Sequence, residues 1–233
     1  MMSALVRSLA VLLLAGAAVP ASATESACSG DWICIEPVED QYGNVSFFAR
    51  NLREFPVTVS LRVRGTNLQS DGLNPVTRTV PGGDRDELIR LEIANKLQGS
   101  HYRYWFDWTV GRLDAAHVEG YDYRLPYADG KRYQILQGFG SRFSHTGNEK
   151  YAVDFAMREG TPVHAARDGI VARTEERHDI GCWEDGCGRY ANFIVILHDD
   201  GTTGEYYHLQ QDGVLVEPGQ RVERGQHIGY SGN

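Results

Sequence analysis

The sequence predicts an all-β protein of two domains, and three observations support this prediction. Segments in which apolar and polar residues alternate recur in the first half of the chain, as expected for half-buried strands. Glycines become dense after residue 137 and separate short apolar runs, which is typical of an antiparallel β domain with tight turns. The 233 residues also exceed the usual length of one domain.

Residues 1–23 predict a cleaved secretory signal peptide. Met1–Arg7 carries one positive charge, Ser8–Val19 is almost wholly apolar, and Ala21–Ala23 forms a small-residue cleavage site. The apolar run is shorter than the roughly 20 residues that a membrane-spanning helix needs. We therefore expect a periplasmic or secreted protein without stable membrane insertion after cleavage.

Residues 24–125 predict a β-sandwich-like domain. Three strand-like segments each place a row of large apolar residues on one face. The rows are Val57, Val59, Leu61 and Val63, then Ile89, Leu91 and Ile93, then Tyr102, Tyr104, Phe106 and Trp108. The spacing of the aromatic row indicates core, with a ligand platform as the alternative. The polar segment 126–133 contains Pro126 and Gly130 and predicts a linker.

Residues 134–233 predict a second, antiparallel β domain. Its clearest element is a hairpin over residues 192–209, NFIVILHDDGTTGEYYHL, in which two strands rich in β-branched and aromatic residues flank Asp199–Gly201. Neither domain shows the periodicity of an amphipathic helix.

The four cysteines predict disulfides, because an exported chain folds in an oxidising compartment. We expect the pairs Cys28–Cys34 and Cys182–Cys187, each closing a short loop and contributing about 2 kcal/mol. A four-cysteine zinc site is the alternative, but neither pair has the C-x-x-C spacing. The net charge of −8 and the lack of a basic stripe argue against a nucleic-acid partner.

Three residues in the last third are candidates for chemistry, namely His145, Asp154 and His208. A neutral imidazole and a carboxylate are good zinc ligands. In the strand-like YAVDFAM, Asp154 points to the face opposite Val153 and Phe155, so its carboxylate can face a cleft. Taken singly, each histidine could be an ordinary solvated residue and the aspartate a turn residue.

Three stretches of residues 134–233 resemble the catalytic domain of the M23 (LytM, lysostaphin-like) zinc metallopeptidases. They are QGFGSRFSHTGNEKYAVDFAMREGTPVHAARDGIV, NFIVILHDDGTTGEYYHLQ and GVLVEPGQRVERGQHIGYSGN. The resemblance does not extend to the N-terminal domain. It implies a β-sheet groove that holds Zn²⁺ and hydrolysis of peptide cross-links in bacterial peptidoglycan.

The resemblance also assigns roles to the three candidates. His145 and Asp154 match the family's first two metal ligands, although their interval is longer than the H-x-x-x-D of the best-known members and resembles longer-loop relatives. His208 matches the histidine of the family's Y-x-H-L segment, a catalytic neighbour of the metal. The third ligand would come from an H-L-H motif, and this sequence contains no H-x-H. We therefore expect a domain truncated after GYSGN that binds zinc weakly.

The resemblance thus predicts an exported zinc metalloendopeptidase. The missing H-x-H keeps a second interpretation open, a catalytically inactive LytM-like regulator that binds and activates a cell-wall amidase. A plain wall-binding module is a third, for which the N-terminal domain is the candidate.

Overall fold

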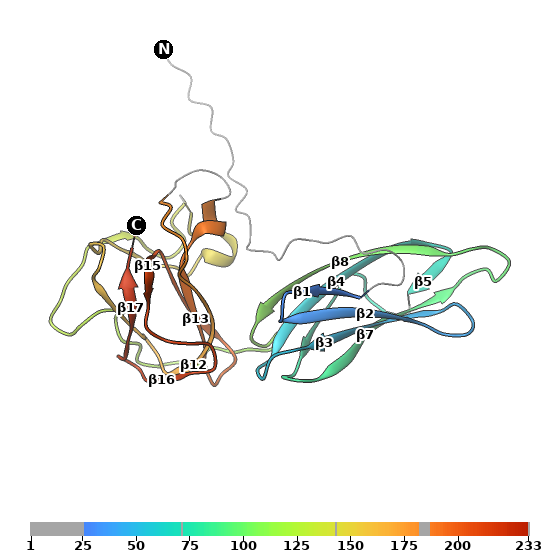
Figure 1. The fold of residues 1–233 in the computed structure, drawn as a ribbon, viewed down its shortest axis with the longest axis horizontal. Coiled ribbons are helices and arrows are strands. Elements are labelled where there is room, and N and C mark those ends of the chain that lie inside the picture. The colour runs from blue at the N-terminus through green and yellow to red at the C-terminus, as the bar shows by residue number, and fades with distance from the viewer. Residues whose placement is uncertain (1–25, 71, 143, 182–186, 233) are drawn as a thin grey trace, which may run out of the picture. The chain divides into compact units, whose positions relative to one another are not determined.

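The structure, a computed structural model, describes residues 26–232 except 71, 143 and 182–186. It contains two compact units. The N-terminal unit runs through Val118 and includes Asp199–Thr203, and the C-terminal unit comprises Glu119–His198 and Gly204–Asn233. Strands dominate both units, and the described residues contain only two 3-10 helices (Figure 1). The predicted all-β class is confirmed, whereas the predicted domain and linker limits remain predictions.

Two of the predicted features fall outside the described residues. The signal peptide predicted over 1–23 is one, and Cys182 of the second expected disulfide is the other. Among the residues that are described, no helix has the length and apolarity needed to cross a membrane.

The N-terminal unit consists of two antiparallel sheets. One sheet has the order β1-β2-β3-β7-β5 and the other has the order β6-β4-β8. The strands are β1 (Ala27–Ser29), β2 (Ile33–Glu39), β3 (Val45–Asn51), β4 (Val57–Thr66), β5 (Leu68–Ser70), β6 (Val76–Val80), β7 (Arg85–Ile93) and β8 (His101–Val110).

The predicted apolar rows form the core between these sheets. On β4 all four residues of the row are buried, and on β8 the side chains of Tyr102, Tyr104 and Phe106 are buried. Phe47 of β3 packs edge-on against Tyr102 and Tyr104 at 5.2 and 5.3 Å between ring centroids. The aromatic row is therefore core, and because it joins both sheets, the unit is a β-sandwich.

Two local features add to this sandwich. A bulge lies in β7, since Phe47 faces Ile89 while Phe48 faces Glu87, which leaves Leu88 as an extra, buried residue. The predicted disulfide between Cys28 and Cys34 is present and links opposed positions of β1 and β2.

The C-terminal unit contains three small antiparallel sheets, with the orders β14-β13-β12-β16, β11-β17-β15 and β10-β9. Its elements are β9 (Ile135–Gln137), η1 (Gly147–Glu149), β10 (Asp154–Phe155), β11 (Pro162–His164), β12 (Gly169–Glu175), η2 (Cys187–Tyr190), β13 (Phe193–Leu197), β14 (Thr203–Tyr207), β15 (Leu209–Val214), β16 (Arg221–Val222) and β17 (His227–Ser231).

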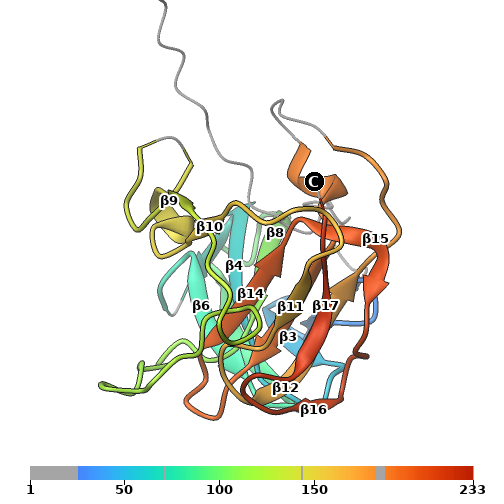
Figure 2. The ribbon, with the colours of Figure 1, turned by 90° about the vertical axis from the view of Figure 1, so that its left-hand side faces the viewer.

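The strands of the predicted hairpin belong to the four-stranded sheet of this unit, with β14 at its edge. Strands β13 and β14 are neighbours, and Gly201 in the turn has a φ of +83°, a conformation that favours glycine. All five residues of β13 are buried, and Ile194 and Ile196 join Val171, Leu209 and Ile228 in one core cluster. Two views place η1 and the C-terminal end of β17 at the end of the unit away from β16 (Figures 1 and 2).

Candidate metal centre

A local hairpin brings His145 and Asp154 together. Strands β9 and β10 pair antiparallel with Gln137 opposite Asp154, and His145 lies in the loop of residues 138–153 between them. The loop turns back at Gly140 and Gly147, whose φ angles are +68° and +58°, and the Gly140 N–H donates to the Lys150 carbonyl at 2.8 Å. Glycine takes such positive φ values without steric cost.

The two side chains meet at 3.0 Å between His145 Nε2 and Asp154 Oδ1. The imidazole is enclosed, with 4% of its side chain exposed, while 40% of the Asp154 side chain is exposed. The pair therefore has one rigid, buried member and one member that reaches solvent.

The second nitrogen of His145 determines what this contact means. Nδ1 lies 3.0 Å from the Gly138 carbonyl oxygen, which can only accept, so the ring proton belongs on Nδ1. In the neutral ring Nε2 then presents a lone pair toward a carboxylate oxygen, and these two acceptors need a proton or a cation between them. Two ligands of a tetrahedral zinc ion lie about 3.3 Å apart. The geometry of the pair thus fits two zinc ligands.

Gln137 orients the carboxylate, and the sequence did not single it out. Its Nε2 donates to Asp154 Oδ2 at 2.6 Å and to Ser144 Oγ at 3.1 Å, and its Oε1 accepts from Ser141 Oγ at 2.9 Å. These contacts leave Oδ1 directed toward His145. Outer contacts of this kind fix metal ligands in place. The contact between Gln137 and the Asp154 carboxylate becomes visible only once β9 is paired with β10.

His208 lies between β14 and β15. Its φ is +58°, its carbonyl accepts the Gly232 N–H at 2.6 Å, and its side chain is exposed. The hydrogen bonds of the His145–Asp154 pair go to Gly138 and Gln137, so the role of His208 remains a prediction.

One electrostatic interaction links the end of β14 to the loop that carries His145. Burial raises the pKa of Tyr207 well above its usual range, and the carboxylates of Glu205 and, more weakly, Glu149 add to this rise. Glu149 belongs to η1, in the same loop as His145, so it lies within electrostatic range of Tyr207.

Among the residues that the structure describes, no third metal ligand joins the pair. Over the described part of the chain, no group of three or more His, Cys, Asp or Glu residues could hold a metal ion. A catalytic zinc usually takes three ligands from the protein, and the expected weak zinc binding of this chain remains a prediction.

Two other histidines of this unit contact each other. The rings of His164 and His227, on neighbouring strands β11 and β17, stack at 5.4 Å. Burial lowers the pKa of His164, and the nearby charges of His227 and Arg124 lower it further, while Asp129 acts in the opposite direction. We assign no catalytic role to these residues.

Comparisons with known proteins show what the C-terminal unit is similar to. The model of Peptidase family M23 matches residues 148–233. Peptidoglycan DD-endopeptidase ShyA of Vibrio cholerae is 35% identical over 111 residues, which are 46% of this chain and 23% of that protein. Glycyl-glycine endopeptidase ALE-1 of Staphylococcus capitis is 39% identical over 88 residues, 37% of this chain and 21% of that protein.

A longer alignment involves an uncharacterised metalloprotease of Haemophilus influenzae, which is 28% identical over 182 residues, 77% of this chain and 33% of that protein. The chain thus spans a third or less of these relatives. The crystal structure of a zinc-containing peptidase from Vibrio cholerae aligns over 86% of this chain and 77% of that chain, with 18% identity and a TM-score of 0.37.

The matched segment contains Asp154 and His208, two of the three predicted site residues, and the relatives that align with the chain are named as endopeptidases or metalloproteases. Residues 148–233 of the C-terminal unit are thus similar to Peptidase family M23.

Proposed function

We propose that this protein is an exported zinc metalloendopeptidase that hydrolyses peptide cross-links of bacterial peptidoglycan. The observation that carries the proposal is the approach of His145 Nε2 to Asp154 Oδ1 at 3.0 Å, with the ring proton held on the other nitrogen. The match of residues 148–233 to the family model and the names of the relatives support the class of reaction and the polymer.

Each residue of the site has a distinct task in this proposal. His145 and Asp154 hold the metal, the Gly138 carbonyl keeps the imidazole proton on Nδ1, and Gln137 keeps the carboxylate oriented. Zinc bound there would polarise the scissile carbonyl and acidify a water molecule. The His208 imidazole would accept the proton of the attacking water and return it to the leaving amine nitrogen. Such proton transfer contributes about 10²- to 10⁴-fold in rate.

Export to the periplasm or the medium is also proposed. It is supported by the signal-like pattern of residues 1–23 and by the disulfide Cys28–Cys34, since disulfides persist in oxidising compartments.

A second candidate function rests on the incomplete ligand set. Because only two ligand residues converge in the described part of the chain, the protein could be a regulator that binds and activates a cell-wall amidase. This function would require neither zinc nor His208.

The two functions separate in one experiment on purified peptidoglycan sacculi. The chain, its His145→Ala variant and a His101→Ala control, which removes an exposed histidine of β8, are compared with and without a zinc chelator. The peptidase proposal expects release of soluble fragments that is lost in His145→Ala and with chelator, and kept in the control. Release that survives both treatments contradicts the zinc mechanism. Absence of release, combined with stimulation of an added amidase, favours the regulator.

A further inference from the structure

The outer face of the β6-β4-β8 sheet carries side chains that the core does not use. Alternation along β4 directs Ser60, Arg62 and Arg64 outward, opposite to the buried apolar row. In the register of β4 with β8, Asp107 lies opposite Ser60, Trp105 opposite Arg62, and Arg103 opposite Arg64. Six residues therefore lie on one face of two paired strands.

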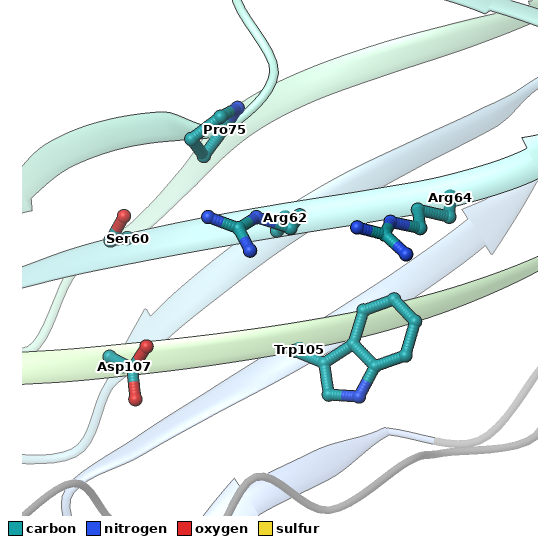
Figure 3. A pocket seen from close by; sticks show the side chains of 6 residues that line it. All are labelled: Ser60, Arg62, Arg64, Pro75, Trp105 and Asp107. Carbon is teal, nitrogen blue, oxygen red and sulfur yellow. The ribbon is translucent and has the colours of Figure 1, made fainter.

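This face is hollowed. A cavity of about 340 Å³ is lined by Ser60, Arg62, Arg64, Pro75, Trp105 and Asp107. Figure 3 shows the guanidinium groups of Arg62 and Arg64 on β4 beside the Trp105 indole on β8, with Asp107 and Ser60 at the other end of the hollow. The Arg64 guanidinium lies 5.9 Å from the centre of the indole ring.

The arginines on this face make no ion pairs within the described residues. Within the described residues, none of Arg62, Arg64 and Arg103 takes part in an ion pair, although the chain carries a net charge of −8. On the other sheet, in contrast, Arg50 and Arg85 pair with one carboxylate at 2.7 and 2.8 Å. Three guanidinium groups without a carboxylate partner leave their planar donor forks available for a ligand.

The arrangement defines the ligand by its chemistry. Guanidinium groups bind carboxylates in a bidentate manner, and an indole face stacks on the apolar face of a sugar or side chain. Asp107 at the far end accepts from an amine or hydroxyl and would repel a phosphate. From Arg103 to Asp107 the strand extends about 13 Å, the length of a short peptide.

We propose that this hollow, together with Arg103 beside Arg64, binds the stem peptides of peptidoglycan, with their carboxylates on the three arginines and an amine or hydroxyl on Asp107. Stem peptides carry carboxylates and amines on one short chain, which matches the two ends of the hollow. The choice of polymer rests on the function proposed above. The site would hold the protein on its polymeric substrate independently of the metal centre.

Co-sedimentation of the full chain with purified sacculi, in the presence of chelator, tests this site. The double variant Arg62→Gln/Arg64→Gln is compared with Lys131→Gln/Arg132→Gln, which removes the same charge from two exposed residues elsewhere. We expect binding about tenfold weaker for the first and unchanged for the second. Trp105→Ala, which keeps the charge, should weaken binding about fivefold. Melting temperatures verify that all variants fold.

Two further arms identify the ligand. Amidation of the sacculus carboxyl groups should lower wild-type binding to the level of the arginine variant, and single-stranded DNA should not compete. Equal binding of wild type and arginine variant, equal binding of amidated sacculi, or effective competition by DNA would each overturn the proposal.

The same samples separate this site from the proposed hydrolysis. If the chain binds sacculi through the arginines but releases no fragments, the hydrolysis proposal is wrong and the site stands. If fragments are released while the arginine variant binds like the wild type, the site is wrong and the hydrolysis stands.

Discussion

Substitution of Gln137 by leucine tests whether the carboxylate of Asp154 is positioned for a metal. The change removes four hydrogen bonds, of 2.6, 2.9, 3.1 and 3.5 Å, and nearly preserves side-chain volume. The 2.6 Å bond to the carboxylate dominates, because hydrogen bonds to charged groups contribute about 1.5–3 kcal/mol. Gln137 is half-buried, so we take the lower value, about 1.5 kcal/mol, which corresponds to about tenfold weaker zinc binding.

The assay is competition between the protein and a chromogenic chelator for zinc at neutral pH. Gln134→Leu provides the matched control, because Gln134 is exposed and only its backbone carbonyl is bonded, to Ala156 N–H. A Gln137→Leu protein that unfolds like the wild type and binds zinc within twofold of it would refute the proposed orienting role.

Three further changes test the fold around the sites. Phe47→Ala opens a cavity in the sandwich core and should lower the free energy of unfolding by about 3–5 kcal/mol in urea titrations, whereas the exposed Val38→Ala should change it by less than about 0.5 kcal/mol. Gly232→Ala places a Cβ 2.6 Å from the backbone of β15 and should lower the free energy of unfolding by about 1–3 kcal/mol. Gly99→Ala, whose Cβ meets no atom within 4 Å, should not lower it in this way. The lowered pKa of His164 makes the folded state bind fewer protons than the unfolded state, so stability is complete above about pH 6.5 and falls as the pH drops through the folded pKa. His164→Gln should make the free energy of unfolding depend less steeply on pH. An equal pH dependence in the wild type and the variant would contradict the role given to His164.

The sequence was sufficient for the fold class because the strand signal is local. The alternating rows of β4 and β8 are buried as expected, and the β13–β14 hairpin forms around its predicted turn. The exception in β7 has a physical reason. The bulge at Leu88 inserts a buried residue between the two faces, and strict alternation cannot anticipate an inserted residue.

The candidate site was predicted in part. The flanking sequence singled out His145 and Asp154, and the structure brings these two side chains together. Gln137 was missed, because its contact with Asp154 depends on the register of β9 against β10 and on the rotamer of one amide. Cross-strand register is set by tertiary packing, which single residues do not reveal. The arginine face of β4 was missed for the same reason, since Arg62 and Trp105 meet only across paired strands.

The proposed site combines two ligands that are close in sequence with a histidine from a distant segment, and this division has a measurable consequence. His145 and Asp154 lie on one hairpin, nine residues apart, whereas His208 is held through its carbonyl by Gly232 at the end of β17. A side chain at position 232 would displace the backbone beside His208 without touching the hairpin. Gly232→Ala should therefore leave zinc affinity unchanged and reduce fragment release from sacculi, while Gln137→Leu reduces both. Equal losses of zinc affinity in the two variants would show that ligand pair and histidine form a single coupled unit.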